Sequence, residues 1–230
     1  MKDCQIIYAP VGVPTFHLES AQAEFEKSVG MLHGIDKGIV CPEEMLLSID
    51  ALGKYLEDKH PDLVIFQNIT FANSAYMEEV LRRFHHTSVL IWTVREPAID
   101  GGRLRLNSLT GAFSASNALR MYGKVFEYVY GSADEDKVRK KISAAVKAVK
   151  LKKDLEDLKL AQIGHTPQGF GFGRALDGDM LYEFGVRLES IESRELIETA
   201  KSYSDDEIQA YLADAGKRIN GLDSIDKKNV

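Results

Sequence analysis

The chain has 230 residues, enough for one large domain or two small ones, and its 44% hydrophobic content is that of an ordinary globular protein. Its net charge of −6 offers no basic surface to nucleic acid, and no apolar run approaches the ~18 residues that a membrane-spanning helix needs. With no signal-peptide pattern and only two cysteines, which form no CxxC motif, we expect a cytoplasmic protein that binds neither nucleic acid nor membrane.

The N-terminal segment predicts two strands and two helices. Residues 5–10 are an apolar strand, and residues 18–32 carry apolar side chains on one helical face. A short second strand is expected at 38–40. A helix is expected over 42–56, with Pro42 at its first position and acidic residues in its first turn. No G-x-G-x-x-G motif follows the first strand, which argues against a dinucleotide site.

The central segment, residues 62–131, alternates strands with helices. The expected strands and helices, in chain order, are 63–66, 73–86, 88–94, 107–122 and 125–130. Such alternation is typical of a parallel sheet whose two faces are both covered by helices. We therefore predict an α/β fold with a doubly wound parallel sheet of five strands, which is a Rossmann-like three-layer domain.

A long helix starts near residue 134, and a second run of strands and helices follows it. Its expected elements are strands at 160–164 and 186–191 and helices at 179–184, at 193–202 and after the Ser204/Glu207 capping box. We place a boundary here, with an N-terminal α/β domain over 1–157 and the first part of a second α/β domain over 158–230. The second domain has only two strands where sheets average about 5–6, and residues 223–230 resemble the start of a further helix.

Polar residues gather at the carboxyl ends of the central strands. These ends carry Gln67 and Asn68, the segment from Thr93 to Glu96, and Gly131. In open parallel sheets, ligands bind outside the carboxyl ends of the strands. We therefore expect a binding site along this edge.

Several motifs resemble one known family in order and spacing from about residue 60 to about residue 208. They are Leu90-Ile91-Trp92, Glu96-Pro97, Leu106-Asn107-Ser108-Leu109-Thr110-Gly111, Tyr128-Val129-Tyr130-Gly131, Ile163-Gly164-His165-Thr166-Pro167-Gln168-Gly169-Phe170, Phe184-Gly185-Val186 and Glu192-Ser193-Arg194-Glu195-Leu196. The family is that of the L-fucose and L-arabinose isomerases, in its fucose-isomerase-like branch. The first 55 residues or so match it only in pattern.

The resemblance implies a cytoplasmic aldose–ketose isomerase with three domains and a monosaccharide substrate. It also implies a Mn²⁺ ion, bound by two carboxylates and a histidine in sequence beyond Val230, so that this chain holds no catalytic residue and no metal ligand. In such enzymes the N-terminal domain covers the active site of a neighbouring subunit, which implies a homo-oligomer.

Carried onto this chain, the resemblance implies substrate contacts from the strand-end loops at Thr15, Phe16, Trp92, Glu96 and Asn107. Carboxylate and amide groups bind sugar hydroxyls, and an aromatic face packs against sugar C–H groups. Each residue also has a plainer interpretation. Trp92 could be a core aromatic, Glu96 a surface charge before a proline, and Asn107 or Ser108 a helix N-cap.

Two other classes of function stay open. The chain could be a non-catalytic module that binds a sugar or another small ligand between two α/β lobes. It could also be a regulatory or assembly protein that uses the same fold without chemistry. Turnover of a sugar in the presence of manganese would separate the enzyme from both alternatives.

Overall fold

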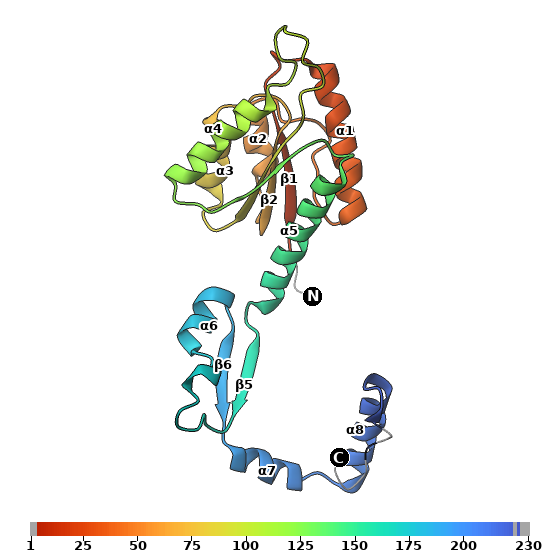
Figure 1. The fold of residues 1–230 in the computed structure, drawn as a ribbon, viewed down its shortest axis with the longest axis vertical. Coiled ribbons are helices and arrows are strands. Elements are labelled where there is room, and N and C mark those ends of the chain that lie inside the picture. Colours follow the sequence, from red (N-terminus) through yellow and green to blue (C-terminus); the bar gives the residue numbers. More distant parts are fainter. Residues whose placement is uncertain (1–3, 223–224, 226–230) are drawn as a thin grey trace. The chain divides into compact units, whose positions relative to one another are not determined.

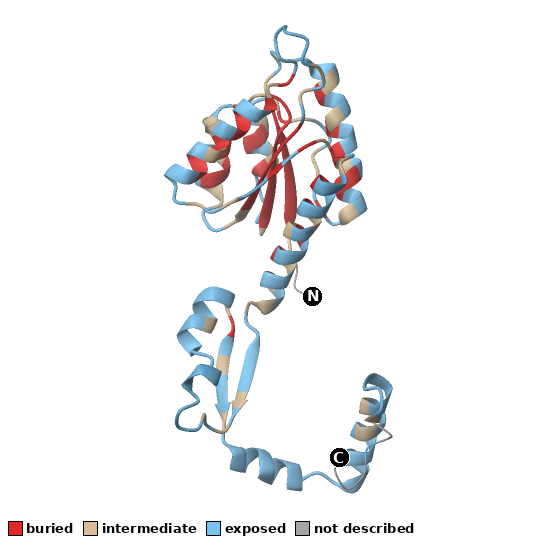
Figure 2. Ribbon diagram, viewed as in Figure 1, coloured by how far each residue is buried: buried red, intermediate tan, exposed pale blue. Residues whose placement is uncertain are grey.

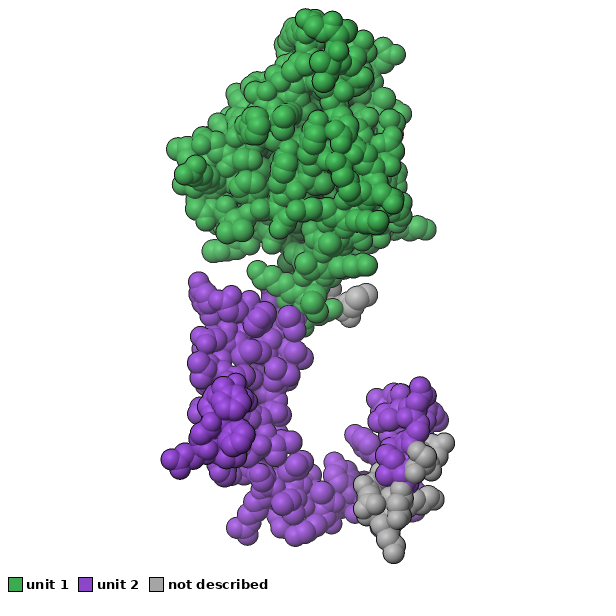
Figure 3. Space-filling model, viewed as in Figure 1, with its two compact units in different colours: residues 1–154 green, residues 155–230 purple. Residues whose placement is uncertain are grey.

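The computed structural model describes residues 4–222 and residue 225, and it divides the chain into two compact units (Figure 3). Unit 1 is Met1–Asp154 and unit 2 is Leu155–Val230. The helix start expected at 223–230 falls largely outside the described residues.

Unit 1 is built on a four-stranded, fully parallel sheet with the strand order β1-β2-β3-β4 (Figure 1). The strands are β1 (Ile6–Val11), β2 (Leu63–Asn68), β3 (Ser88–Thr93) and β4 (Glu127–Tyr130). Every residue of β1 and β2 is buried, as expected for central strands that are covered on both faces.

The short second strand predicted at 38–40 is reduced to a bridge. Val40 pairs with Ile7 on the free side of β1, and the chain then leaves the sheet and returns at Leu46, which pairs with Val11. The predicted strand was therefore wrong in length. Pro42 has no N–H to donate, so the ladder cannot continue through it.

The predicted helix at 42–56 also begins later than expected. The helix α2 (Ile49–Leu56) starts after Ser48, whose side chain accepts a hydrogen bond of 3.0 Å from the N–H of Ala51. The backbone N–H of Leu46 is instead donated to the carbonyl of Pro10 at 2.8 Å. Pairing with β1 therefore overrides the helical signal of Pro42.

Helices cover both faces of the sheet, which confirms the doubly wound arrangement (Figures 1 and 2). One face packs against α1 (Leu18–Ile35) and α5 (Asp136–Leu155). The other face packs against α2, α3 (Ser74–Arg83) and α4 (Ser108–Met121). Figure 2 shows the buried residues concentrated in the strands and on the inner sides of these helices.

Unit 2 holds a second, two-stranded parallel sheet of β5 (Lys159–Ile163) and β6 (Arg187–Ile191). Its helices are the 3₁₀ turn η1 (Gly171–Gly173), α6 (Asp177–Phe184), α7 (Ser193–Lys201) and α8 (Asp205–Arg218). The predicted capping box at Ser204 and Glu207 is present. Among the residues described in this unit, only Val186 is buried.

Candidate functional site

The carboxyl ends of all four strands of unit 1 lie along one edge of the sheet, because every strand pair is parallel. The strands end at Val11, Asn68, Thr93 and Tyr130. The loops that follow are therefore neighbours although they are far apart in the sequence. We call this set of loops the strand-end rim, with residues 12–17, 69–73, 94–107 and 131–135.

The loop after β1 is anchored to the next two loops of the rim. The N–H of Val13 is donated to Thr70 Oγ1 at 2.8 Å, and the N–H of His17 is donated to the carbonyl of Arg105 at 3.0 Å. Between these anchors, Thr15 is exposed and Phe16 is half-buried. Both predicted contact residues of this loop therefore lie on the rim.

Phe16 joins three loops of the rim. Its ring packs against Phe71 with ring centroids 6.3 Å apart, and the guanidinium carbon of Arg103 lies 4.9 Å from the Phe16 centroid. The N–H of Phe71 is also donated to the carbonyl of Leu106 at 2.8 Å. The structure thus brings the first loop together with the long loop between β3 and α4.

Glu96 shapes that long loop. Its carboxylate accepts hydrogen bonds from the backbone N–H groups of Arg105 at 2.5 Å, Leu106 at 3.0 Å and Asn107 at 2.9 Å. Because these bonds engage both carboxylate oxygens, Glu96 is not a free surface charge, although the half-buried carboxylate keeps lone pairs that could accept a sugar hydroxyl. It closes the loop on itself.

Asn107 occupies the N-cap position of α4 without capping the helix through its side chain. Its backbone is left-handed, with φ of 51°, a conformation that asparagine tolerates better than most residues. Its Oδ1 accepts a hydrogen bond of 2.7 Å from Thr110 Oγ1. The side chain is half-buried on the rim, which keeps Asn107 as a candidate contact residue.

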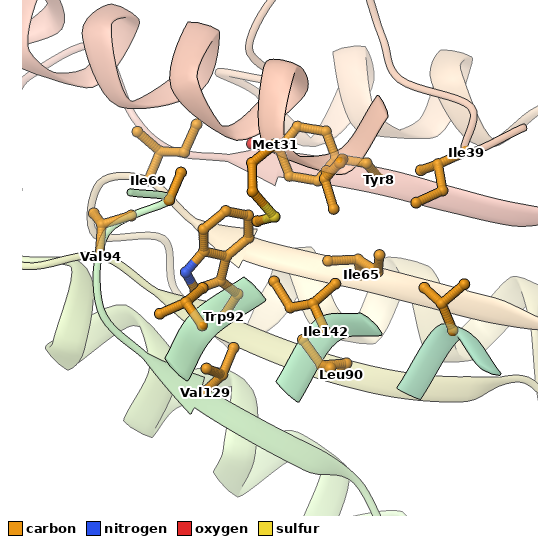
Figure 4. Close-up of a cluster of buried hydrophobic side chains, with 14 of the residues drawn as sticks. Tyr8, Met31, Ile39, Ile65, Ile69, Leu90, Trp92, Val94, Val129 and Ile142 are labelled. Carbon is orange, nitrogen blue, oxygen red and sulfur yellow. The ribbon is translucent and has the colours of Figure 1, made fainter. Parts of the chain in front are cut away.

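Trp92 is a core residue. It is 0% exposed, and its indole ring lies among Met31, Ile69 and Val94 beneath the rim (Figure 4). Its Nε1–H is donated to the carbonyl of Gly131 at 2.8 Å. A fully buried ring has no exposed face for a ligand, which favours the core interpretation of Trp92 over a direct sugar contact.

A buried polar layer lies directly beneath the rim, at the strand ends that the sequence marked as polar. Gln67 accepts a hydrogen bond from Tyr8 and donates one of 3.0 Å to Ser28 Oγ. Asn68 is fully buried, and its two side-chain amide atoms have no hydrogen-bond partner within the described part of the chain. Both residues therefore support the rim from below and present no surface to solvent.

Ser108 is a structural link that sequence reasoning missed. Its Oγ accepts the N–H of Val94 at 3.0 Å and donates to the carbonyl of Asn68, so it joins the ends of β2 and β3. It lies in the motif Leu106–Gly111, but a serine at a helix start normally suggests capping. Only the position of the neighbouring strand shows what this hydroxyl bonds.

An ion pair holds the far end of the rim. Arg95 donates two hydrogen bonds to Glu135, from Nε at 2.7 Å and from Nη2 at 3.0 Å, and its guanidinium lies 4.8 Å from the Tyr130 centroid. The Arg95 guanidinium and the N–H of Ser132 lower the pKa of Glu135 to about 2. Arg95 and Glu135 thus neutralise each other.

The described residues do not fit a catalytic metal. Among residues 4–222 and 225, no group of three histidine, cysteine, aspartate or glutamate side chains is placed to hold a metal ion. The same described residues contain no helix that is long and apolar enough to cross a membrane. What the rim offers is a set of hydrogen-bonding groups and exposed arginines at the edge of the sheet.

Comparison with known proteins finds relatives along the whole chain. The sulfoquinovose isomerase of Clostridium sp. (strain MSTE9) is 53% identical over 230 residues, which are 100% of this chain and 51% of that protein. The sulfoquinovose isomerase of Priestia megaterium is 32% identical over 99% of this chain and 51% of that protein. That of Alkalicoccus urumqiensis is 27% identical over 96% of this chain and 50% of that protein.

The match is limited in one respect. The chain spans about half the length of the curated relatives it matches. No protein-family model matches it.

Proposed function

We propose that this chain is part of a sugar aldose–ketose isomerase of the fucose-isomerase-like group, and that sulfoquinovose is its substrate. The observation that carries the proposal is the 53% identity, over all 230 residues, to a protein named sulfoquinovose isomerase. The strand-end rim supports it, since ligands of open parallel sheets bind at that edge. The fucose-isomerase-like relation rests on the motifs between about residue 60 and about residue 208.

In this proposal the catalytic carboxylates and the Mn²⁺ ion belong to sequence that this chain does not contain. The described residues do not fit such a metal, so we derive no catalytic step from them. Shifting a carbonyl between C1 and C2 requires a proton to move between those carbons, which is the task of positioned acids and bases. This chain supplies a wall of the site.

The rim would form that wall, and its residues have distinct tasks. Thr15 and Phe16 present a hydroxyl and an aromatic edge, and Asn107 presents an amide for sugar hydroxyls. Glu96 holds the loop that carries Asn107, and Trp92 supports the loops from the core. A wall held by such contacts keeps its binding groups in place before the sugar arrives.

Unit 2 would be the first part of a domain that the rest of the polypeptide completes. Large apolar side chains are exposed on this unit, among them Leu160, Ile163, Phe172, Tyr182 and Tyr211. A unit with one buried residue among those described has no hydrophobic core of its own. The relatives are about twice as long as this chain, so they have the sequence to cover these side chains.

We further propose that the rim covers the active site of a neighbouring subunit in a homo-oligomer. Mixed oligomers of the complete protein test this. One subunit type carries a substitution at Asn107, the other a substitution at the metal site, and each parent must be inactive alone. Partial recovery of activity on mixing is expected. No recovery in well-mixed oligomers would place both sets of residues within one subunit.

The test of the function compares the complete protein with the 230-residue chain. The complete protein with Mn²⁺ should convert sulfoquinovose into the corresponding 2-ketose, detected by NMR, and the 230-residue chain should not. Sugar binding without turnover by the complete protein would instead support the binding module. Turnover by the isolated chain would show that its own residues suffice for the chemistry.

A further inference from the structure

The long loop of the rim carries two exposed arginines that form no ion pair within the described residues. Residues 95–107 contain three arginines and two acids. Arg95 is paired with Glu135, the carboxylate of Glu96 is bonded to the backbone of its own loop, and Asp100 accepts the N–H of Gly102 at 3.0 Å. Arg103 and Arg105 are exposed and have no acidic partner within the described residues.

Arg103 is held in place by an aromatic ring. Its guanidinium carbon lies 4.9 Å from the Phe16 centroid, and the Phe16 ring is itself packed against Phe71. A guanidinium over an aromatic face keeps its N–H groups, which lie in its own plane, free for an oxyanion. Phe16 therefore limits the movement of Arg103 and leaves its donors available.

The backbone beside Arg103 is also fixed. Two residues further on, the N–H of Arg105 is bonded to Glu96 and its carbonyl accepts the N–H of His17. The loop is thus tied both to itself and to the loop after β1. A cation on such a loop loses little freedom when it binds a ligand, which favours binding.

We propose that Arg103 binds the anionic substituent of the substrate, a sulfonate, with Arg105 as a second exposed guanidinium on the same loop. This inference rests on the proposed function, because the relatives are named for a sulfonated sugar. A sulfonate presents three oxygens and stays charged throughout the physiological pH range. The planar guanidinium can hold two of those oxygens at once, as it holds phosphate or carboxylate. An uncharged sugar offers no oxyanion to this cation.

The test uses the complete protein with Arg103→Gln and, as a matched control, Arg120→Gln. Arg120 is an exposed arginine in the last turn of α4, outside the rim. Each variant is assayed for isomerisation of sulfoquinovose and of 6-deoxyglucose, which lacks the sulfonate. Binding of sulfoquinovose is also measured by calorimetry, so that one result does not depend on turnover.

We expect Arg103→Gln to lower kcat/KM and affinity for sulfoquinovose by about 10- to 100-fold, the effect of losing a charged hydrogen bond. Activity towards 6-deoxyglucose should change little, and Arg120→Gln should change neither. An equal loss on both sugars, or no loss, would overturn the proposal.

The proposed function can fail separately. If the unsubstituted protein isomerises neither sugar, the proposed function is wrong. Calorimetry is then the only test of whether Arg103 binds the anion. Binding of sulfoquinovose that Arg103→Gln abolishes would support the site. Absent binding, or binding that this substitution leaves unchanged, would overturn it.

Discussion

The carboxylate of Glu96 accepts the backbone N–H of Asn107 at 2.9 Å, which joins the start of the long rim loop to the first turn of α4. Together with the bonds from the N–H groups of Arg105 and Leu106, this bond closes the thirteen-residue segment 95–107 into a loop. The conformation of the long rim loop therefore depends on this carboxylate.

Replacing Glu96 by glutamine should destabilise the protein. The amide keeps one oxygen to accept a hydrogen bond and turns an NH₂ group towards a backbone donor, so we expect a loss of about 1–3 kcal/mol in the free energy of unfolding. Urea unfolding of the 230-residue chain measures this. Glu78→Gln, an exposed position on α3, is the control and should change little. Equal stability of the two variants would show that the loop does not depend on Glu96.

The Arg95–Glu135 ion pair should make stability depend on acid pH. The pKa of Glu135 falls from its ordinary value of 4.5 to about 2 in the folded protein. A lowered folded-state pKa contributes stability that is complete above pH 4.5 and is lost as the pH falls towards 2. The difference in unfolding free energy between the wild type and Glu135→Gln should therefore shrink across this window. A difference that stays constant from pH 7 to pH 2 would contradict the pairing.

Trp92→Phe should affect stability and leave the sugar preference unchanged. The smaller ring leaves a cavity in the core and an unpaired carbonyl at Gly131, so we expect a loss of about 2–4 kcal/mol. Circular dichroism during urea unfolding measures it, with Phe113→Leu at an exposed aromatic as the control. Because Trp92 is the single tryptophan, wild-type fluorescence should shift to longer wavelengths on unfolding. Emission already typical of an exposed indole in the folded protein would contradict its burial.

Limited proteolysis should leave an N-terminal fragment that ends between about residue 150 and about residue 160. Unit 1 has buried strands with helices on both faces, whereas unit 2 exposes nearly all its described residues. Residues 1–157, expressed alone, should then give a cooperative unfolding transition. Early cleavage within 62–131 would show that the sheet does not fold as a stable unit.

The class of fold could be predicted from the sequence because its signals are local. The apolar stripe of Met77, Val80 and Leu81 marks one helix face, and the Ser204/Glu207 pair starts another helix, each through neighbours within four residues. Apolar runs between such helices predict parallel strands with both faces covered. These patterns indicated the α/β layers and the polar edge before any contact was known.

Only the tertiary structure decided which partners, distant in the sequence, these residues contact. Val40 pairs with β1 for only one bridge, and Glu96 bonds to N–H groups as far along the chain as Asn107. Trp92 at the end of an apolar run looks the same in sequence whether its ring faces a ligand or the core. Its burial depends on α1 and on the carbonyl of Gly131, 39 residues away. Local periodicity carries no information about such partners, because they are brought together only when the sheet and its helices pack.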